Sequence, residues 1–181
     1  MKKTKLNIGC GRDIRADFIN CDCVFSDRVD KVFDLNIYPY PFKDNQFEEI
    51  ACYSVLEHLE SPERVIEEMW RISRPNAKVI IVVPHFSCWQ AWGDLTHRRP
   101  FNSTSLFSFS NKKSHRDSSS LINTHKEKFN VDSRILFGRI KKFFLFERIF
   151  NVNNYLKGFY ERHLAYIFPA ENILFELETI K

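Results

Sequence analysis

The stretch Lys5-Leu-Asn-Ile-Gly-Cys-Gly11 decides the fold class, because a short apolar run ends abruptly in two glycines. Lys5–Ile8 predicts a buried strand, and Gly9-Cys-Gly11 predicts a tight turn at its carboxyl end, where a ligand can approach the backbone closely. A second short strand over residues 18–22 ends in Asp22. A carboxylate there can accept hydrogen bonds from both hydroxyls of a ribose, so the pair of features indicates a nucleoside-binding α/β protein.

The spacing between the glycine turn and Asp22 argues against a dinucleotide. Ile14 stands where a dinucleotide-binding turn has its third glycine, and ten residues separate Gly11 from Asp22. Without the strand residues, about six remain, which is less than two turns of helix. A pyrophosphate would lack the long helix whose amino end normally binds it, whereas a ligand with adenosine and no phosphate fits.

The rest of the chain predicts an α/β fold with a mainly parallel sheet. A helix should begin at Ser61-Pro62 and end at Pro75-Asn76, and Lys78–Val83 is apolar on both faces, like a strand inside a covered sheet. Residues 111–128 have the composition of a polar loop. The remaining expected elements are strands over residues 31–34, 49–53 and 130–137, helices over 143–150 and 155–168, and a last, edge strand over 172–180.

Composition narrows the class of protein further. A chain of 181 residues with 15% aromatic content is too apolar for general disorder, and it has no apolar run long enough to span a membrane and no secretory signal. Five cysteines without a framework spacing suggest reduced thiols, hence a cytoplasmic protein. The net charge is −5 over residues 1–70 and +9 over residues 71–181. The basic second half could attract an anionic substrate, a nucleic acid or a membrane surface, or its charged side chains could simply be solvated.

Several motifs together resemble class I S-adenosylmethionine-dependent methyltransferases, in particular the small type-11-like group. The resemblance covers nearly the whole chain, and Val55-Leu-Glu-His-Leu59 is its most specific part. It implies a Rossmann-like sheet with an antiparallel last strand, here with a shortened first helix and no amino-terminal lid. One domain is expected over residues 1–181, with a cofactor-binding core (1–84), substrate-side insertions and helices (85–170) and a closing strand (171–181). The other matching segments are Leu6–Gly11, Ile19–Asp22, Val32–Leu35, Tyr40–Phe47, Trp70–Pro75, Trp92–Arg99 and Phe168–Glu178.

The resemblance implies S-adenosylmethionine as cofactor and assigns roles to individual residues. Gly9, Cys10 and Gly11 would present backbone to the methionine part, and Asp22 would bind the ribose. Cys23 and Leu35 would flank the adenine, and Asp34 would bind its amino group or else serve only as a turn acid. Two further positions complete the cofactor set: Ser54, which follows the fourth strand, and Asn7, which stands where many members have an acid.

Methyl transfer to a hydroxyl needs a base besides orientation. His58, His85 and His97 are the candidates, because all are expected at the carboxyl ends of the fourth and fifth strands or beyond them. Asp94, Arg98 and Arg99 could bind substrate, and the two arginines would suit a phosphate or carboxylate. No metal site is expected, since no Cys-x-x-Cys or His-x-x-x-His spacing occurs and buried cysteines pack as small apolar residues.

The sequence therefore predicts a cytoplasmic S-adenosylmethionine-dependent methyltransferase with a small-molecule or glycan acceptor, lipid-linked glycans included. The alternative is a methyltransferase-like protein that has lost catalysis and acts as a binding or scaffolding partner. Nucleic-acid methylation ranks last, because no Asn/Asp-Pro-Pro-Tyr-type sequence occurs. The basic, aromatic segment Arg139–Phe150 suggests peripheral contact with an anionic membrane as a further hypothesis.

Overall fold

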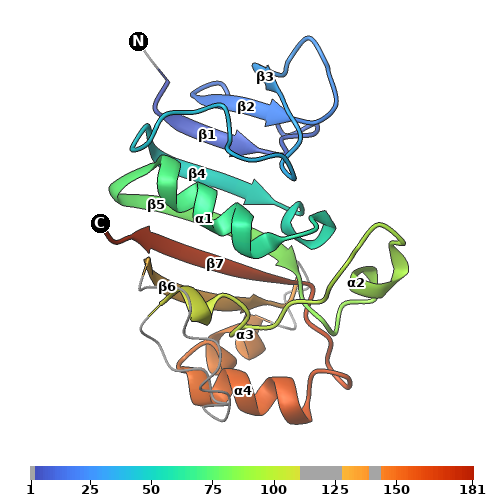
Figure 1. The fold of residues 1–181 in the computed structure, drawn as a ribbon. Coiled ribbons are helices and arrows are strands. Elements are labelled where there is room, and N and C mark those ends of the chain that lie inside the picture. Colours follow the sequence, from blue (N-terminus) through green and yellow to red (C-terminus); the bar gives the residue numbers. More distant parts are fainter. Residues whose placement is uncertain (1–2, 111–127, 139–143) are drawn as a thin grey trace.

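The computed structural model of the protein describes residues 3–110, 128–138 and 144–181. Its centre is a seven-stranded sheet with the order β3-β2-β1-β4-β5-β7-β6 (Figure 1). Every neighbouring pair is parallel except the two pairs that include β7. The strands are β1 (Lys5–Ile8), β2 (Phe18–Asp22), β3 (Lys31–Val32), β4 (Phe47–Tyr53), β5 (Ser73–Pro84), β6 (Phe129–Leu136) and β7 (Asn172–Thr179). The predicted Rossmann-like α/β fold with an antiparallel last strand is confirmed.

One strand has a different place from the one predicted. β7 is not an edge strand: it lies between β5 and β6, and β6 forms the edge. Its alternation arises because Ile173, Phe175 and Leu177 are buried on one face while the acids point to the other. Glu176 on that second face forms ion pairs with Lys78 on β5 at 3.1 Å and with Arg134 on β6 at 2.6 Å. Because of these ion pairs with its two neighbours, a central strand has the alternating polar and apolar residues that predict an edge strand from the sequence alone.

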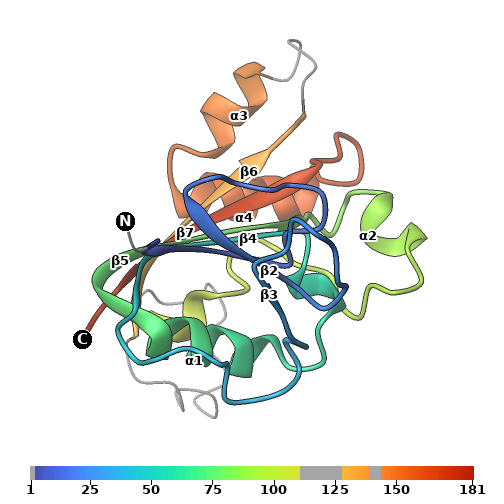
Figure 2. The same ribbon diagram turned by 90° about the horizontal axis from the view of Figure 1, so that it is seen from above.

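The helices cover the sheet unevenly (Figure 2). Helix α1 packs on the face formed by the apolar side chains of β1, β4 and β5, and its own Val65, Ile66 and Met69 are fully buried there. At the β6 end of the sheet, α3 and α4 build a second apolar cluster around Tyr160. The helical elements are η1 (Leu56–His58), α1 (Pro62–Ile72), α2 (Gln90–Gly93), η2 (Phe107–Phe109), α3 (Phe144–Phe150) and α4 (Asn154–His163). In the described part of the chain, no helix has both the length and the apolar character needed to cross a bilayer.

The largest differences from the expected boundaries concern α1, β5 and α4. Helix α1 ends at Ile72, and β5 already begins at Ser73, so Pro75-Asn76 lies inside a strand rather than at the helix end. Helix α4 ends at His163, because the chain turns there and the Tyr160 hydroxyl donates to the Phe168 carbonyl at 2.8 Å. Of the predicted polar loop, residues 111–127 lie outside the described residues, as do residues 139–143 of the basic, aromatic segment.

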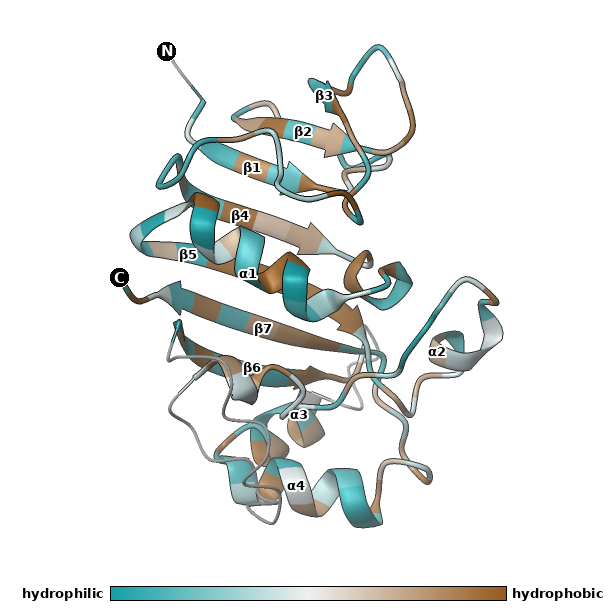
Figure 3. Ribbon diagram, in the orientation of Figure 1, coloured by the Kyte–Doolittle hydropathy of each residue, from teal (hydrophilic) through white to brown (hydrophobic). Residues whose placement is uncertain are grey.

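No helix forms between β1 and β2 (residues 9–17), which confirms the shortened first helix. The strand register explains why. Lys5, Asn7 and Asn20 share one face of the sheet with Glu49, and Phe18 and Ala51 are the apolar side chains there, whereas most of the apolar side chains of these strands point to the α1 side. A helix packed on this polar face would bury little apolar surface, so an irregular loop covers it instead. Figure 3 shows the mixed polar and apolar character of the strands.

Candidate functional site

The turn after β1 lies directly against the turn after β4. Gly9 has φ +63°, and a Cβ there would clash with the Cγ2 methyl of Val55 and lie 3.0 Å from its Cγ1. Gly11 has φ +48°, but a Cβ there would meet nothing within 4 Å. Gly9 is therefore required by packing between two turns, whereas Gly11 borders open space into which a ligand can reach the backbone.

Asp22 points toward this glycine turn. Its Oδ2 accepts a hydrogen bond from the Gly11 N–H at 2.8 Å, and its Oδ1 accepts one from the Val24 N–H at 3.0 Å. The carboxylate is only half-buried at the carboxyl end of β2. Each carboxylate oxygen has more than one acceptor site, so Asp22 keeps the capacity to bind ribose hydroxyls beside the open space at Gly11. This arrangement fits the adenosyl cofactor implied by the sequence.

A side-chain network holds the loop that replaces the first helix. The buried Asn7 amide donates to the Asp13 carbonyl at 2.6 Å and to Asn20 Oδ1 at 3.2 Å. Asn20 also donates to the Arg15 carbonyl at 2.9 Å and accepts from the Arg15 N–H at 3.0 Å. Asn7 thus positions the loop, and its amide is already engaged there. Sequence reasoning missed Asn20, although a buried amide inside a short strand was the available signal.

Asp30 completes this network from the segment before β3. Its Oδ2 accepts from the Asn20 backbone N–H at 2.8 Å, and Lys3 lies 3.3 Å away. The Asn20 N–H, with a further contribution from Lys3, holds the pKa of Asp30 below its usual value. Asp30 was also missed, because nothing near it in the chain distinguishes it from a surface acid.

The remaining predicted cofactor residues lie around the same edge of the sheet. Cys23 is exposed just beyond Asp22, Leu35 is buried, and Ser54 is exposed at φ +52° after β4. The Asp34 carboxylate accepts from the Asn36 N–H at 2.8 Å and from its side-chain amide at 3.1 Å. Asp34 therefore closes a turn, which was the alternative interpretation of this residue.

A cavity of about 740 Å³ opens at the carboxyl ends of β4 and β5. Since β1, β4 and β5 are parallel, it lies on the same edge of the sheet as the glycine turn. We call it the acceptor cavity. Its lining comes from the strand ends, η1 and the segment around α2: Ser54, Glu57, His58, Pro84, Trp89, Gln90, Gly93, Asp94, Leu95, His97 and Asn172.

Three titratable side chains meet in the wall of this cavity. Donor atoms of Glu57, His58 and His97 all lie within 4.8 Å of one another, and the two imidazole rings meet edge to face with centroids 4.6 Å apart. Burial raises the pKa of Glu57 to about 7. Burial, together with the nearby His97, lowers the pKa of His58. Both shifts favour the neutral forms of these groups in the absence of a bound cation. The sequence had offered both histidines but not Glu57.

His85 does not line the cavity. Its side chain is fully buried, with Nδ1 2.7 Å from the Ser87 hydroxyl and Nε2 3.4 Å from Glu161 on α4. The ring also packs on Phe86, with centroids 4.4 Å apart. These contacts connect the end of β5 to α4, so they make His85 a structural contact between elements.

The two arginines are bound to backbone rather than open to the cavity. Arg98 donates from Nε to the His58 carbonyl at 3.1 Å, and its backbone N–H donates to the Glu57 carbonyl at 2.8 Å. Arg99 donates to the Glu60 carbonyl at 2.7 Å. They attach the segment after α2 to η1. Asp94, by contrast, lines the cavity.

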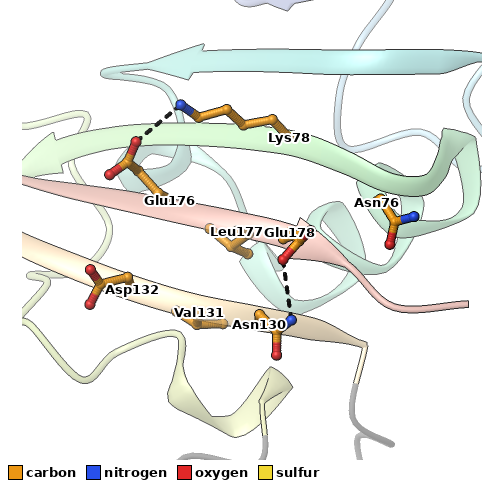
Figure 4. Close-up of a pocket in the computed structure, with 8 residues that line it drawn as sticks. All are labelled: Asn76, Lys78, Asn130, Val131, Asp132, Glu176, Leu177 and Glu178. Carbon is orange, nitrogen blue, oxygen red and sulfur yellow. Dashed lines mark hydrogen bonds and ion pairs between the residues drawn. The ribbon is translucent and has the colours of Figure 1, made fainter.

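A second depression, of about 420 Å³, lies at the opposite end of the sheet (Figure 4). The polar groups drawn there bind one another: Lys78 pairs with Glu176 at 3.1 Å, and Asn130 donates to Glu178 at 3.3 Å. Ligands of open α/β sheets bind at the carboxyl ends of the parallel strands, and this depression is at the other end. The acceptor cavity is therefore the stronger candidate site.

Comparisons with known proteins agree with this geometry. Residues 6–81 match the sequence model of the methyltransferase domain family. A SAM-dependent methyltransferase from Archaeoglobus fulgidus superposes with a TM-score of 0.58 at 15% identity, covering 97% of this chain and 85% of that one. Phosphoethanolamine N-methyltransferase 2 from Haemonchus contortus, solved with S-adenosyl-L-methionine, gives 0.53 at 18% identity over 99% of this chain and 49% of that one.

The [4+2]-cyclase SpnF also shares the fold, with a TM-score of 0.58 at 16% identity over 97% of this chain and 75% of that one. No curated protein matches the sequence. The fold, the glycine turn and Asp22 are the features expected of a nucleoside-binding α/β protein. The match over residues 6–81 adds a similarity to methyltransferase domains, and solved S-adenosylmethionine-dependent methyltransferases share the fold of this chain, so S-adenosylmethionine is the cofactor that the comparisons support.

Proposed function

We propose that the protein transfers a methyl group from S-adenosylmethionine to a hydroxyl of a small-molecule or glycan acceptor. One observation carries the proposal: the acceptor cavity begins at Ser54 and has Glu57, His58 and His97 in its wall. Val55, which directly follows Ser54 in the chain, touches Gly9 of the glycine turn. The cavity and the expected cofactor site are therefore neighbours on one edge of the sheet, as an in-line transfer requires.

The residues present fit the cofactor at three points. Gly11 leaves space beside its backbone, Asp22 lies at that turn with its Oδ2 on the Gly11 N–H, and Ser54 is exposed after β4 at the edge of the cavity. When bound, S-adenosylmethionine supplies a methyl group on a positively charged sulfur that leaves as a neutral thioether. Catalysis by the protein then consists of orienting the acceptor oxygen and taking up its proton.

His58 and His97 are the groups suited to that proton. A neutral imidazole of His58 or His97 would take up the hydroxyl proton as the acceptor oxygen bonds to the methyl carbon and the carbon–sulfur bond breaks. The lowered pKa of His58 keeps its ring neutral near pH 7, so the ring is able to accept a proton. Asp94, 3.7 Å from His97 Nε2, would stabilise the charge that develops on this ring.

The cavity mouth favours a neutral acceptor with apolar or stacking surface. Leu95 is fully exposed, Trp89 is 77% exposed, and both line the cavity; Trp92 beside them is 63% exposed. Indole faces pack on apolar surface and on the carbon–hydrogen faces of sugars. Arg98 and Arg99 do not line the cavity and pair with Glu60 at 3.3 Å and Glu63 at 3.8 Å, so neither is placed to hold an anionic group there. A glycan, including one attached to a lipid, suits this lining.

The test is an equilibrium titration with S-adenosylhomocysteine, the product form of the cofactor. We expect binding with one site per chain, weakened about tenfold to a hundredfold by Asp22→Asn, because an ionised acceptor of two ribose hydroxyls is lost. Asp27→Asn, an exposed acid beyond β2, is the matched control and should leave the affinity unchanged. No binding at millimolar ligand would contradict the proposal.

The same titration addresses the second candidate function, a binding or scaffolding protein without catalysis. Its support is the loop at residues 9–17, which offers fewer backbone N–H groups to a cofactor than a helix would. Failure to bind S-adenosylhomocysteine by an intact, folded chain would favour this alternative. Binding followed by methylation of a glycan or small hydroxyl compound, measured with methyl-labelled cofactor, would favour the enzyme.

A further inference from the structure

The side chain of Glu57 is placed where a lone carboxylate is costly. It is 1% exposed, and neither of its oxygens has a hydrogen-bond partner among the described residues. An unpaired buried carboxylate is strongly disfavoured unless a cation or donors accompany it. One ring nitrogen of His58 and one of His97 lie within 4.8 Å of a carboxylate oxygen of Glu57. Two nitrogens and one oxygen converging in a buried wall form the donor set of many divalent-metal sites.

The hydrogen bonds around His58 set which of its nitrogens is free. Thr96 Oγ1 donates its only proton to Asp94 Oδ1 at 2.7 Å. The contact of 2.9 Å between Thr96 Oγ1 and His58 Nδ1 must then be donated by the imidazole. His58 therefore carries its proton on Nδ1 and keeps a lone pair on Nε2, which is the form that binds a metal ion.

His97 has the same arrangement. Its Nδ1 lies 3.4 Å from the Ala91 carbonyl, which can only accept, so a proton on Nδ1 has a partner there and Nε2, 3.7 Å from Asp94 Oδ2, can offer its lone pair to an ion. In each ring, Nδ1 contacts an oxygen atom. Histidines that bind metal ions in proteins usually have such a hydrogen bond on the nitrogen that does not bind the metal, and the bond fixes the tautomer and orients the ring. Two histidines with a purely structural role would have no need to carry their protons on the same ring nitrogen, Nδ1.

We propose that Glu57, His58 and His97 bind one divalent transition-metal ion, with open coordination positions facing the acceptor cavity. The donor set of two nitrogens and one carboxylate favours zinc, cobalt, iron or manganese over magnesium or calcium, which prefer oxygen alone. Bonds of about 2.1 Å require donors about 3.0–3.5 Å apart, so small side-chain rotations would contract the present spacing. Three protein ligands with an open position are typical of metal sites that bind substrate.

The inference rests on the proposed function and deepens it. The ion would lower the pKa of a hydroxyl bound to it, so that the proton could leave to water, and His58 and His97 would then serve as ligands in place of the base role described above. The acceptor class then narrows to compounds that present a hydroxyl oxygen to a metal ion. Thr96 would be a positioning residue, since it acts on the ion only through His58, whereas Asp94 Oδ2 lies 3.7 Å from His97 Nε2, the nitrogen that would bind the ion.

The test uses Co²⁺ added to the full chain after treatment with a chelator, because the visible absorption of Co²⁺ reports its coordination. We expect one ion per chain, no thiolate charge-transfer band, and an affinity reduced about a hundredfold or more by Glu57→Gln or His97→Ala. Thr96→Ala should weaken binding about tenfold, and His163→Ala, which removes an exposed imidazole on α4, should have no effect. Absence of one-to-one binding, or unchanged binding in both ligand variants, would overturn the proposal.

Titration of the same samples with S-adenosylhomocysteine separates the two proposals. Cofactor binding without Co²⁺ binding would contradict the metal site and leave the methyltransferase function standing. Co²⁺ binding that depends on Glu57 and His97, without cofactor binding, would contradict the function alone. Retained cofactor binding in Glu57→Gln also establishes that this variant is folded.

Discussion

Replacement of Gly9 by alanine tests the contact between the turns after β1 and β4. The new Cβ would clash with Val55 Cγ2, and φ at this position is +63°. The left-handed conformation costs an L-residue about 1–2 kcal/mol, and overpacking a tight contact costs about 1–3 kcal/mol. We therefore expect Gly9→Ala to lower the free energy of unfolding by about 2–5 kcal/mol, measured by urea denaturation at neutral pH.

Two further variants separate the packing term from the backbone term. Gly11→Ala has a similar φ but no neighbour within 4 Å, so only the conformational cost of about 1–2 kcal/mol should remain. Combining Gly9→Ala with Val55→Ala removes the clashing methyl groups and should recover part of the loss. If Gly9→Ala is as stable as Gly11→Ala, or if Val55→Ala adds its own loss without any recovery, the reasoning about this contact is wrong.

Two other predictions concern stability. Asp30→Asn should lose about 1–2 kcal/mol at pH 7, because Asn20 loses a charged acceptor. The folded-state pKa of Asp30 is lowered, so the stabilisation by its ionised carboxylate is present above the usual carboxyl pKa and is lost as the pH falls through the lowered value. At that low pH the unmodified protein and Asp30→Asn should therefore have the same stability. Asp27→Asn, the control, should be as stable as the unmodified protein at pH 7. His85→Ala should cost about 2–4 kcal/mol by leaving a buried cavity and breaking the contact with Glu161. S-adenosylhomocysteine affinity should not change in His85→Ala, whereas a large loss of that affinity would contradict the structural role.

Much of the sheet could be predicted, since its strands have local signals. β1 and β2 were predicted with their exact bounds, because apolar runs end at glycines or at an acid. The order of the last two strands could not be predicted. The alternation in β7 is the same whether its polar face meets solvent or the charged side chains of Lys78 and Arg134, and only the fold decides between these.

The candidate site was predictable where it depends on strand ends. Gly11 and Asp22 meet because parallel neighbours end at one edge. His85 has the same kind of position, but its location at a strand end does not determine which way the ring turns, and the ring turns into the core. The meeting of His58 and His97 depends on the irregular segment after β5, which has no periodicity to interpret. Glu57 had a local signal, an acid inside the apolar Val55–Leu59 stretch.

The central position of β7 has a consequence for how the chain folds during synthesis. β5 and β6 each pair with β7 and not with each other, and β7 is the last of the seven strands along the chain. Until residues 172–179 leave the ribosome, both β5 and β6 present open edges able to pair with other chains. Completion of the sheet, and protection from aggregation at those edges, therefore waits for the insertion of one late segment into the middle of the fold.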